Sequence, residues 1–221
     1  MRKKIPSKFN NRKNSGFTLV ELIVVLVILA ILAAILIPAL MGYIDRAKKQ
    51  QYILNARNAM TATQAGLVDL YAKSGGEVAA NASIIPGSKT PGNNGDCDAT
   101  NTDFAKKVLE TADLTGDNEP YCYMIAVGSN YSTTAKVTDK DKYTVFYALY
   151  IDKEDSPHIY YYNGDWSDNN PRKNNSNKIL SGTNEFASGP YKGKKIQYYL
   201  ISNKSGKDFS NNDFWGWIKK D

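Results

Sequence analysis

Histidine and cysteine are almost absent from this 221-residue chain, which contains one histidine and two cysteines. Cys97 and Cys122 form no C-x-x-C pair, and with His158 they give too few soft ligands for a zinc site. The chain also lacks a glycine-rich phosphate loop, a G-x-S-x-G sequence and an H-E-x-x-H sequence. We therefore expect neither catalysis nor a bound cofactor or metal, and we interpret His158 as the start of a strand.

Acidic residues are absent from the first 16 positions, which hold six of the 28 basic side chains. The other 22 basic residues are balanced by 22 acidic ones, so the net charge of +6 belongs to the N-terminal leader. The remainder has no charge excess that would attract nucleic acid, and no dedicated nucleic-acid site is predicted. The weaker alternative is a nucleic-acid or sugar contact where lysines accompany tyrosines: Lys192, Lys194, Lys195, Lys204 and Lys207 near Tyr198 and Tyr199.

One long apolar run, Leu22 to Ile37, contains no charge. Extended to Phe17 and Met41 it gives a helix of about 37 Å, long enough to span a bilayer. The mean hydropathy of -0.45 excludes a multi-span protein. A secretory signal peptide is disfavoured, because its apolar region has about 7 to 15 residues and ends in an A-x-A site, which is missing here. The basic leader would remain in the cytoplasm and the C-terminus outside.

Glu21 is a carboxylate inside this apolar stretch. Such a group costs about 2.5–3.5 kcal/mol at the centre of a bilayer, so we expect it to have a partner and a function. A single-span anchor of an ectoenzyme or binding protein would explain the run and the leader, but it needs none of Gly16, Glu21 or Pro38. Pro38 cannot donate a hydrogen bond to the carbonyl of Ala34 and is expected to kink or open the helix.

The sequence Gly16-Phe17-Thr18-Leu19-Val20-Glu21-Leu22, between the basic leader and the apolar helix, resembles the N-terminus of a type IV prepilin. The resemblance covers about residues 12–71. It implies cleavage between Gly16 and Phe17 by a prepilin peptidase and N-methylation of Phe17 by the same enzyme. It also implies that Glu21 pairs with the Phe17 amine of a neighbouring subunit and thereby sets the register of assembly.

The function implied by this resemblance is structural: a prepilin in the cytoplasmic membrane that polymerises into an extracellular type IV pilus filament for adhesion or motility. Its partners would be other pilin subunits, the prepilin peptidase and the pilus assembly machinery in the membrane. A minor pilin, or a pseudopilin of a type II secretion or DNA-uptake machine, is the alternative within the same superfamily. A membrane-anchored ectoenzyme or binding protein is the alternative of another class.

The expected fold class is α+β, the type IV pilin fold, in which a long N-terminal helix packs on an antiparallel sheet. Residues 1–16 are the cleaved leader, 17–41 the transmembrane and filament-core helix, 42–74 its amphipathic continuation and 75–221 the globular headgroup. The sequence predicts one helix of 56 residues, from Phe17 to about Ala72. Residues at spacings of three or four along its second half predict a face that packs on the sheet. These residues are Ile53, Ala56, Met60, Thr63, Leu67, Leu70 and Tyr71.

The headgroup begins with a long polar connection, residues 75–101, and a short helix that Thr102 or Asp103 caps and that ends near Ala112. Period-two patterns then predict strands, and short connections predict antiparallel order. The predicted strands are Tyr121 to Val127, Tyr143 to Ile151, His158 to Tyr162, Ile196 to Ile201 and Phe214 to Ile218.

Because the headgroup is expected outside the reducing cytoplasm, Cys97 and Cys122 are predicted to form a disulfide; two buried thiols are the alternative. Two acidic clusters lack the pattern of a calcium loop and are interpreted as flexible surface charge. They are Asp139 and Asp141, and Asp152, Glu154 and Asp155.

Overall fold

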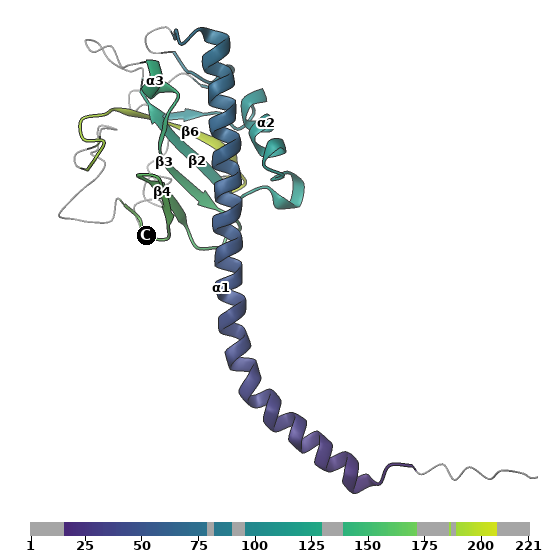
Figure 1. Cartoon of the computed structure of the whole chain (residues 1–221). Coiled ribbons are helices and arrows are strands. Elements are labelled where there is room, and N and C mark those ends of the chain that lie inside the picture. Colours follow the sequence, from purple (N-terminus) through teal and green to yellow (C-terminus); the bar gives the residue numbers. More distant parts are fainter. Residues whose placement is uncertain are drawn as a thin grey trace, which may run out of the picture. The chain divides into compact units, whose positions relative to one another are not determined.

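The computed structural model describes residues 16–78, 82–89, 96–129, 139–171, 186 and 189–206, which form an α+β fold (Figure 1). Helix α1 (Leu19–Ser74) has 56 residues, as predicted, and is displaced by two positions from the predicted bounds. It contributes to both compact units of the chain, Met1–Ala47 and Lys48–Asp221.

The apolar half of α1 lies in the first unit and curves along its length (Figure 1). Pro38 lies inside this helix and does not end it, so a local kink at this residue stays a prediction. The helix is long and apolar enough to cross a membrane.

The second unit contains a six-stranded sheet with strand order β1-β6-β2-β3-β4-β5. Its strands are β1 (Asp96–Asp98), β2 (Cys122–Gly128), β3 (Val145–Ile151), β4 (Ile159–Tyr162), β5 (Asp165–Ser167) and β6 (Ile196–Asn203). Three short helices accompany them: α2 (Asp103–Thr111), η1 (Gly116–Asn118) and α3 (Asp139–Lys142). The Thr102 side chain caps α2 by accepting a hydrogen bond from the Ala105 amide, which confirms the predicted cap.

Four predicted strands are confirmed as β2, β3, β4 and β6, and they pair in antiparallel order. The prediction missed β5, which follows the Asn163-Gly164 turn, and β1 at the other edge. Antiparallel order is wrong for β1, which pairs with β6 in parallel, because most of the headgroup chain separates these two strands and no short connection fixes their direction. The predicted strand at Phe214 to Ile218 lies outside the described residues.

Both faces of the central strands are covered, because every residue of β2 and β3 is buried. Successive residues of β2 alternate between two cores, with Tyr123 in the first and Met124 in the second. The first core joins the sheet to α1 through residues of the predicted helix face, including Ala56, Met60 and Leu67. The helix α1 crosses this face of the sheet and α2 lies beside it (Figure 1).

Candidate functional site

The N-terminus of α1 is closed by two reciprocal hydrogen bonds between Thr18 and Glu21. The Thr18 amide donates to Glu21 Oε2 at 2.8 Å, and the Glu21 amide donates to Thr18 Oγ1 at 3.3 Å. The Thr18 hydroxyl adds a third bond, also to Glu21 Oε2, at 2.7 Å. This is a capping box, in which a side chain at each end satisfies the other residue's backbone amide.

The capping box gives Glu21 a partner that the sequence analysis missed, although the spacing Thr18-x-x-Glu21 is its signature. Glu21 Oε2 accepts two hydrogen bonds, while Glu21 Oε1 accepts none within the part of the chain that the structure describes. One oxygen therefore holds the carboxylate in place, and the other can accept a hydrogen bond from a further donor.

The Gly16–Phe17 peptide bond precedes the first helical residue, Leu19, and is outside the helical hydrogen-bond ladder. Phe17 is 88% exposed, and no atom of the described residues lies within 4 Å of the position that a Cβ atom at Gly16 would occupy. Cleavage of this bond therefore requires no unwinding of α1.

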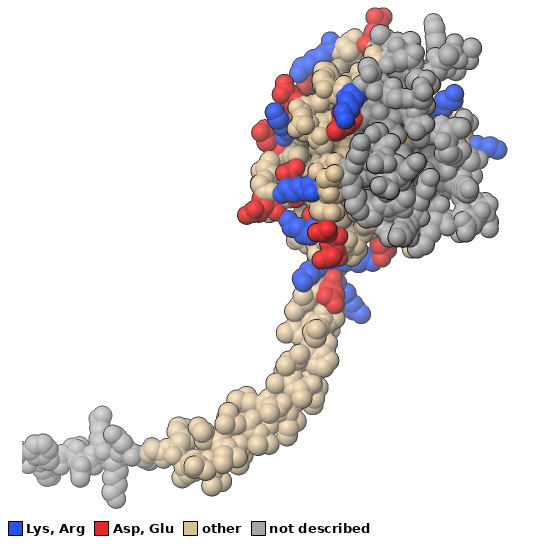
Figure 2. Space-filling model, turned by 180° about the vertical axis from the view of Figure 1, so that it is seen from behind, with Lys and Arg blue, Asp and Glu red and all other residues tan. Residues whose placement is uncertain are grey.

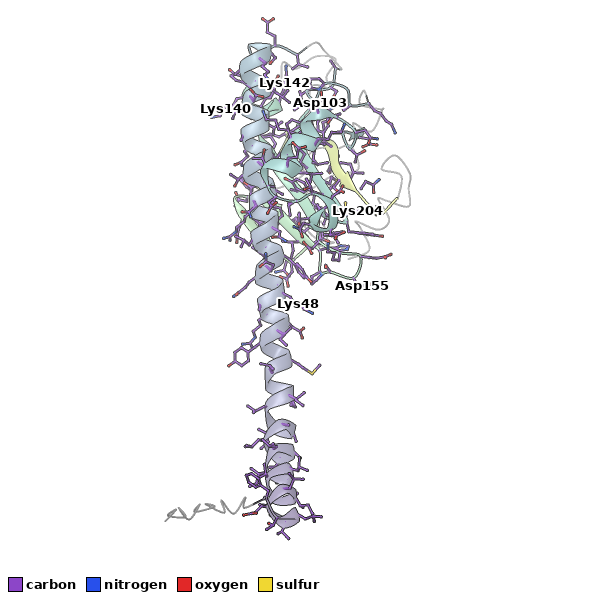
Figure 3. All side chains as sticks on the ribbon, turned by 90° about the vertical axis from the view of Figure 1, so that its right-hand side faces the viewer. Lys48, Asp103, Lys140, Lys142, Asp155 and Lys204 are labelled. Carbon is purple, nitrogen blue, oxygen red and sulfur yellow. The ribbon has the colours of Figure 1, made fainter. Side chains whose placement is uncertain are left out.

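No residue that the structure describes covers the Leu, Ile and Val side chains in the apolar half of α1, and side chains radiate all around this part of the helix (Figure 3). Its Leu, Ile and Val side chains are exposed throughout, from Leu19 at 73% to Ile44 at 44%. A helix that is apolar around its whole circumference is stable when lipid or other helices surround it.

The Cys122 thiol is fully buried, and burial raises its pKa to about 12. Cys122 lies in β2, which is not adjacent to β1 because β6 lies between the two strands. Cys97 pairs with Tyr199 of β6, and Tyr199 pairs on its other side with Ile125 of β2. Two strand spacings amount to about 9.6 Å, beyond the roughly 7 Å that a disulfide spans between Cα atoms. The disulfide stays a prediction, and the strand order weighs against it.

The other candidate groups have ordinary structural partners. His158 Nδ1 lies 3.3 Å from the Tyr160 hydroxyl, one residue before the start of β4. Lys194 forms an ion pair with Asp141 at 2.5 Å, and the Tyr121 hydroxyl donates to Glu154. Among the described residues, no three His, Cys, Asp or Glu side chains are grouped as metal ligands.

The aromatic–lysine alternative loses its stacking platform, because Tyr198 and Tyr199 are fully buried. Figure 2 shows lysine, arginine and acidic side chains interspersed over the described part of one face of the headgroup. This distribution agrees with the balanced charge of the sequence after its leader.

Residues 11–37 match the prokaryotic N-terminal methylation motif, which is the signature of type IV prepilins. No curated protein and no solved structure matches the chain. The matched segment contains Gly16, the capping box and most of the exposed apolar helix. With a long helix packed on a largely antiparallel sheet, the fold agrees with that of type IV pilins, and the chain has the features of a pilin-like prepilin or pseudopilin.

Proposed function

We propose that this chain is the structural subunit of a type IV pilus, cleaved after Gly16 and polymerised through α1 into a cell-surface filament for adhesion or motility. The uncovered apolar half of α1 carries the proposal, because it needs lipid before assembly and other helices afterwards. The methylation motif over the same residues supports this interpretation over a plain anchor.

Processing would take place at the exposed bond between Gly16 and Phe17. A prepilin peptidase would release the basic leader and methylate the new amine of Phe17. The capping box would survive this cleavage, because the amide and hydroxyl of Thr18 and the carboxylate of Glu21 all lie after the cut.

Assembly would bring the Phe17 amine of one copy to Glu21 of a neighbour. Thr18 holds Glu21 Oε2, which leaves Oε1 for the incoming ammonium group. A subunit out of register would leave both charges unpaired among apolar side chains, and this penalty would set the axial register. Burial of the surrounding Leu, Ile and Val side chains would supply most of the association energy, at roughly 1.5–3 kcal/mol for a fully buried side chain.

The test is Glu21→Val in cells that contain no other pilin. The variant should insert into the membrane at least as well as the wild type, because it lacks a charge that costs about 2.5–3.5 kcal/mol. It should nevertheless form few filaments in electron micrographs of sheared cells. Thr18→Ser keeps the capping hydroxyl and is the matched control, which should assemble normally.

A normal filament yield from Glu21→Val would refute the register role of Glu21. Absence of filaments from the wild-type chain, with the leader removed, would refute the pilus subunit itself. Long, abundant filaments would distinguish a major subunit from a minor pilin or a pseudopilin.

A further inference from the structure

A polar cleft of about 420 Å³ lies beside the headgroup half of α1. It is lined by four residues of α1, by the α2–η1 connection, by Asn118 at the end of η1 and by the β3–β4 turn. Asp155 marks this turn in Figure 3. We name it the Asp152 cleft after its most deeply buried charge. Its polar lining residues that matter here are Asn55, Asn58, Asp113, Asn118, Asp152 and Lys153.

Asp152 is 8% exposed, and only one of its carboxylate oxygens has partners. Asp152 Oδ1 accepts hydrogen bonds from Asn55 Nδ2 and from the Tyr150 hydroxyl, both at 3.1 Å. Asp152 Oδ2 receives no hydrogen bond and no ion pair from the described residues. Asp152 Oδ2 is not among the fully buried side-chain atoms that lack a partner, so it stays accessible from the cleft and can accept a hydrogen bond from a ligand there.

The charge of the Asp152 cleft is negative. Asp113 supplies a second carboxylate, which is exposed and forms no ion pair with the described residues. The ammonium group of Lys153 lies 2.5 Å from the backbone carbonyl oxygen of Asp117, to which it donates. The side chains of Asn58 and Asn118 have no hydrogen-bond partner in the described chain and offer two further carbonyl oxygens.

This set of acceptors fits a planar cation with several N–H donors. A bare metal ion is disfavoured, because the described residues contain no group of three acidic or imidazole ligands. A sugar is disfavoured, because no aromatic side chain lines the cleft. A guanidinium group can donate to a carboxylate and to neighbouring amide oxygens at the same time.

Arg57 is the source of such a group at the level of the cleft. It is exposed, follows Asn55 on α1, and its guanidinium has no partner among the described residues. At roughly 100° per residue it points about 110° away from the mean direction of the α1 residues that line the cleft, so it does not face its own cleft. In a filament, each subunit presents one surface to a different surface of its neighbour, and the arginine of one copy can meet the cleft of the next.

We infer that the Asp152 cleft binds the Arg57 guanidinium of a second copy of this chain, as a headgroup contact separate from the apolar helix core. This inference rests on the proposed filament for its occupant. The preference of the cleft for a guanidinium group rests on the headgroup alone. The guanidinium site and its occupant, Arg57 of a second copy, are therefore tested separately.

The site is tested by nuclear magnetic resonance on the full chain in detergent, with ethylguanidinium as the probe and urea as its neutral control. Ethylguanidinium should shift the side-chain amide signals of Asn58 and Asn118 with saturation, and urea should not. Asp113→Asn should weaken the binding about threefold or more. Equal shifts with both probes, no shift at all, or unchanged binding by Asp113→Asn would overturn the site whether or not filaments form.

The occupant is tested by filament yield. Arg57→Glu and Asp113→Arg should each reduce the yield about tenfold, and the double variant should recover at least about half of it, because the pair is restored with its charges exchanged. Arg46→Glu combined with Asp113→Arg is the matched control and should show no recovery. Normal filaments from Arg57→Glu, or no recovery in the double variant, would overturn this occupant. A wild-type chain that is processed but forms no filaments would refute the proposed function and this occupant, while the resonance titration would still decide the site.

Discussion

The hydroxyl pair of Thr63 and Tyr123 links α1 to the centre of the sheet, and its removal should destabilise the headgroup in a non-additive way. Both residues are fully buried. The Thr63 hydroxyl donates to the Ala59 carbonyl at 2.8 Å, so its proton is used, and the Tyr123 hydroxyl, also at 2.8 Å, must be the donor to Thr63 Oγ1.

Thr63→Val keeps the shape of the side chain but leaves the Tyr123 hydroxyl buried without an acceptor, which should cost about 2 kcal/mol of unfolding free energy. Tyr123→Phe removes the donor, while Thr63 keeps its bond to Ala59, and should cost about 1 kcal/mol. The double variant has no unsatisfied donor, so it should also lose about 1 kcal/mol instead of about 3.

Urea unfolding of residues 48–221, the second compact unit, measures these differences if the slope of free energy against urea is the same for all four proteins. A double variant that loses the sum of the two single effects would refute the assigned donor and acceptor roles. A Thr63→Val variant as stable as the wild type would show that this pair does not fasten α1 to the sheet.

Three further predictions concern pH, packing and the cysteines. Burial raises the pKa of Tyr123 and Tyr150 above the usual value of 10, so the folded chain keeps protons that the unfolded chain releases. Unfolding free energy should therefore be unaffected by these groups below about pH 10 and should fall above it, by up to about 1.4 kcal/mol per pH unit for each, as alkaline urea titrations would record. Gly128→Ala should cost about 1–3 kcal/mol in the same assay, because its Cβ atom would collide with a backbone carbonyl of α3. Cys122 should resist alkylation in the folded chain and react after denaturation without reductant, as mass spectrometry would show. If the denatured chain reacts only after reductant is added, Cys122 forms the disulfide with Cys97, and β1 cannot lie beside β6.

The long helix and four of the strands follow from the sequence because their signals are local. A charge-free run followed by a three-to-four-residue apolar period defines α1, and dense tyrosine, valine and isoleucine segments define the strands. The processing site after Gly16 is a prediction from the resemblance of the heptapeptide Gly16–Leu22, and the methylation motif covers the same residues.

The features that the sequence analysis missed depend on contacts between distant segments. The strand β1 has three residues in a polar connection and exists because β6 offers it an edge. The burial of both sheet faces could not be predicted from the sequence. Successive strand residues enter two different cores, and both cores contain tyrosines. The Asp152 cleft joins residues of α1 to a turn almost 100 positions later, so no local pattern marks it.

The central claim is that a processed copy of this chain builds a filament, and the intact mass of the subunit from sheared surface filaments tests it most directly. The account predicts a chain that begins at Phe17 and carries one added methyl group. A subunit that retains Met1, or that begins beyond Pro38 and so lacks the apolar half of α1, would contradict it.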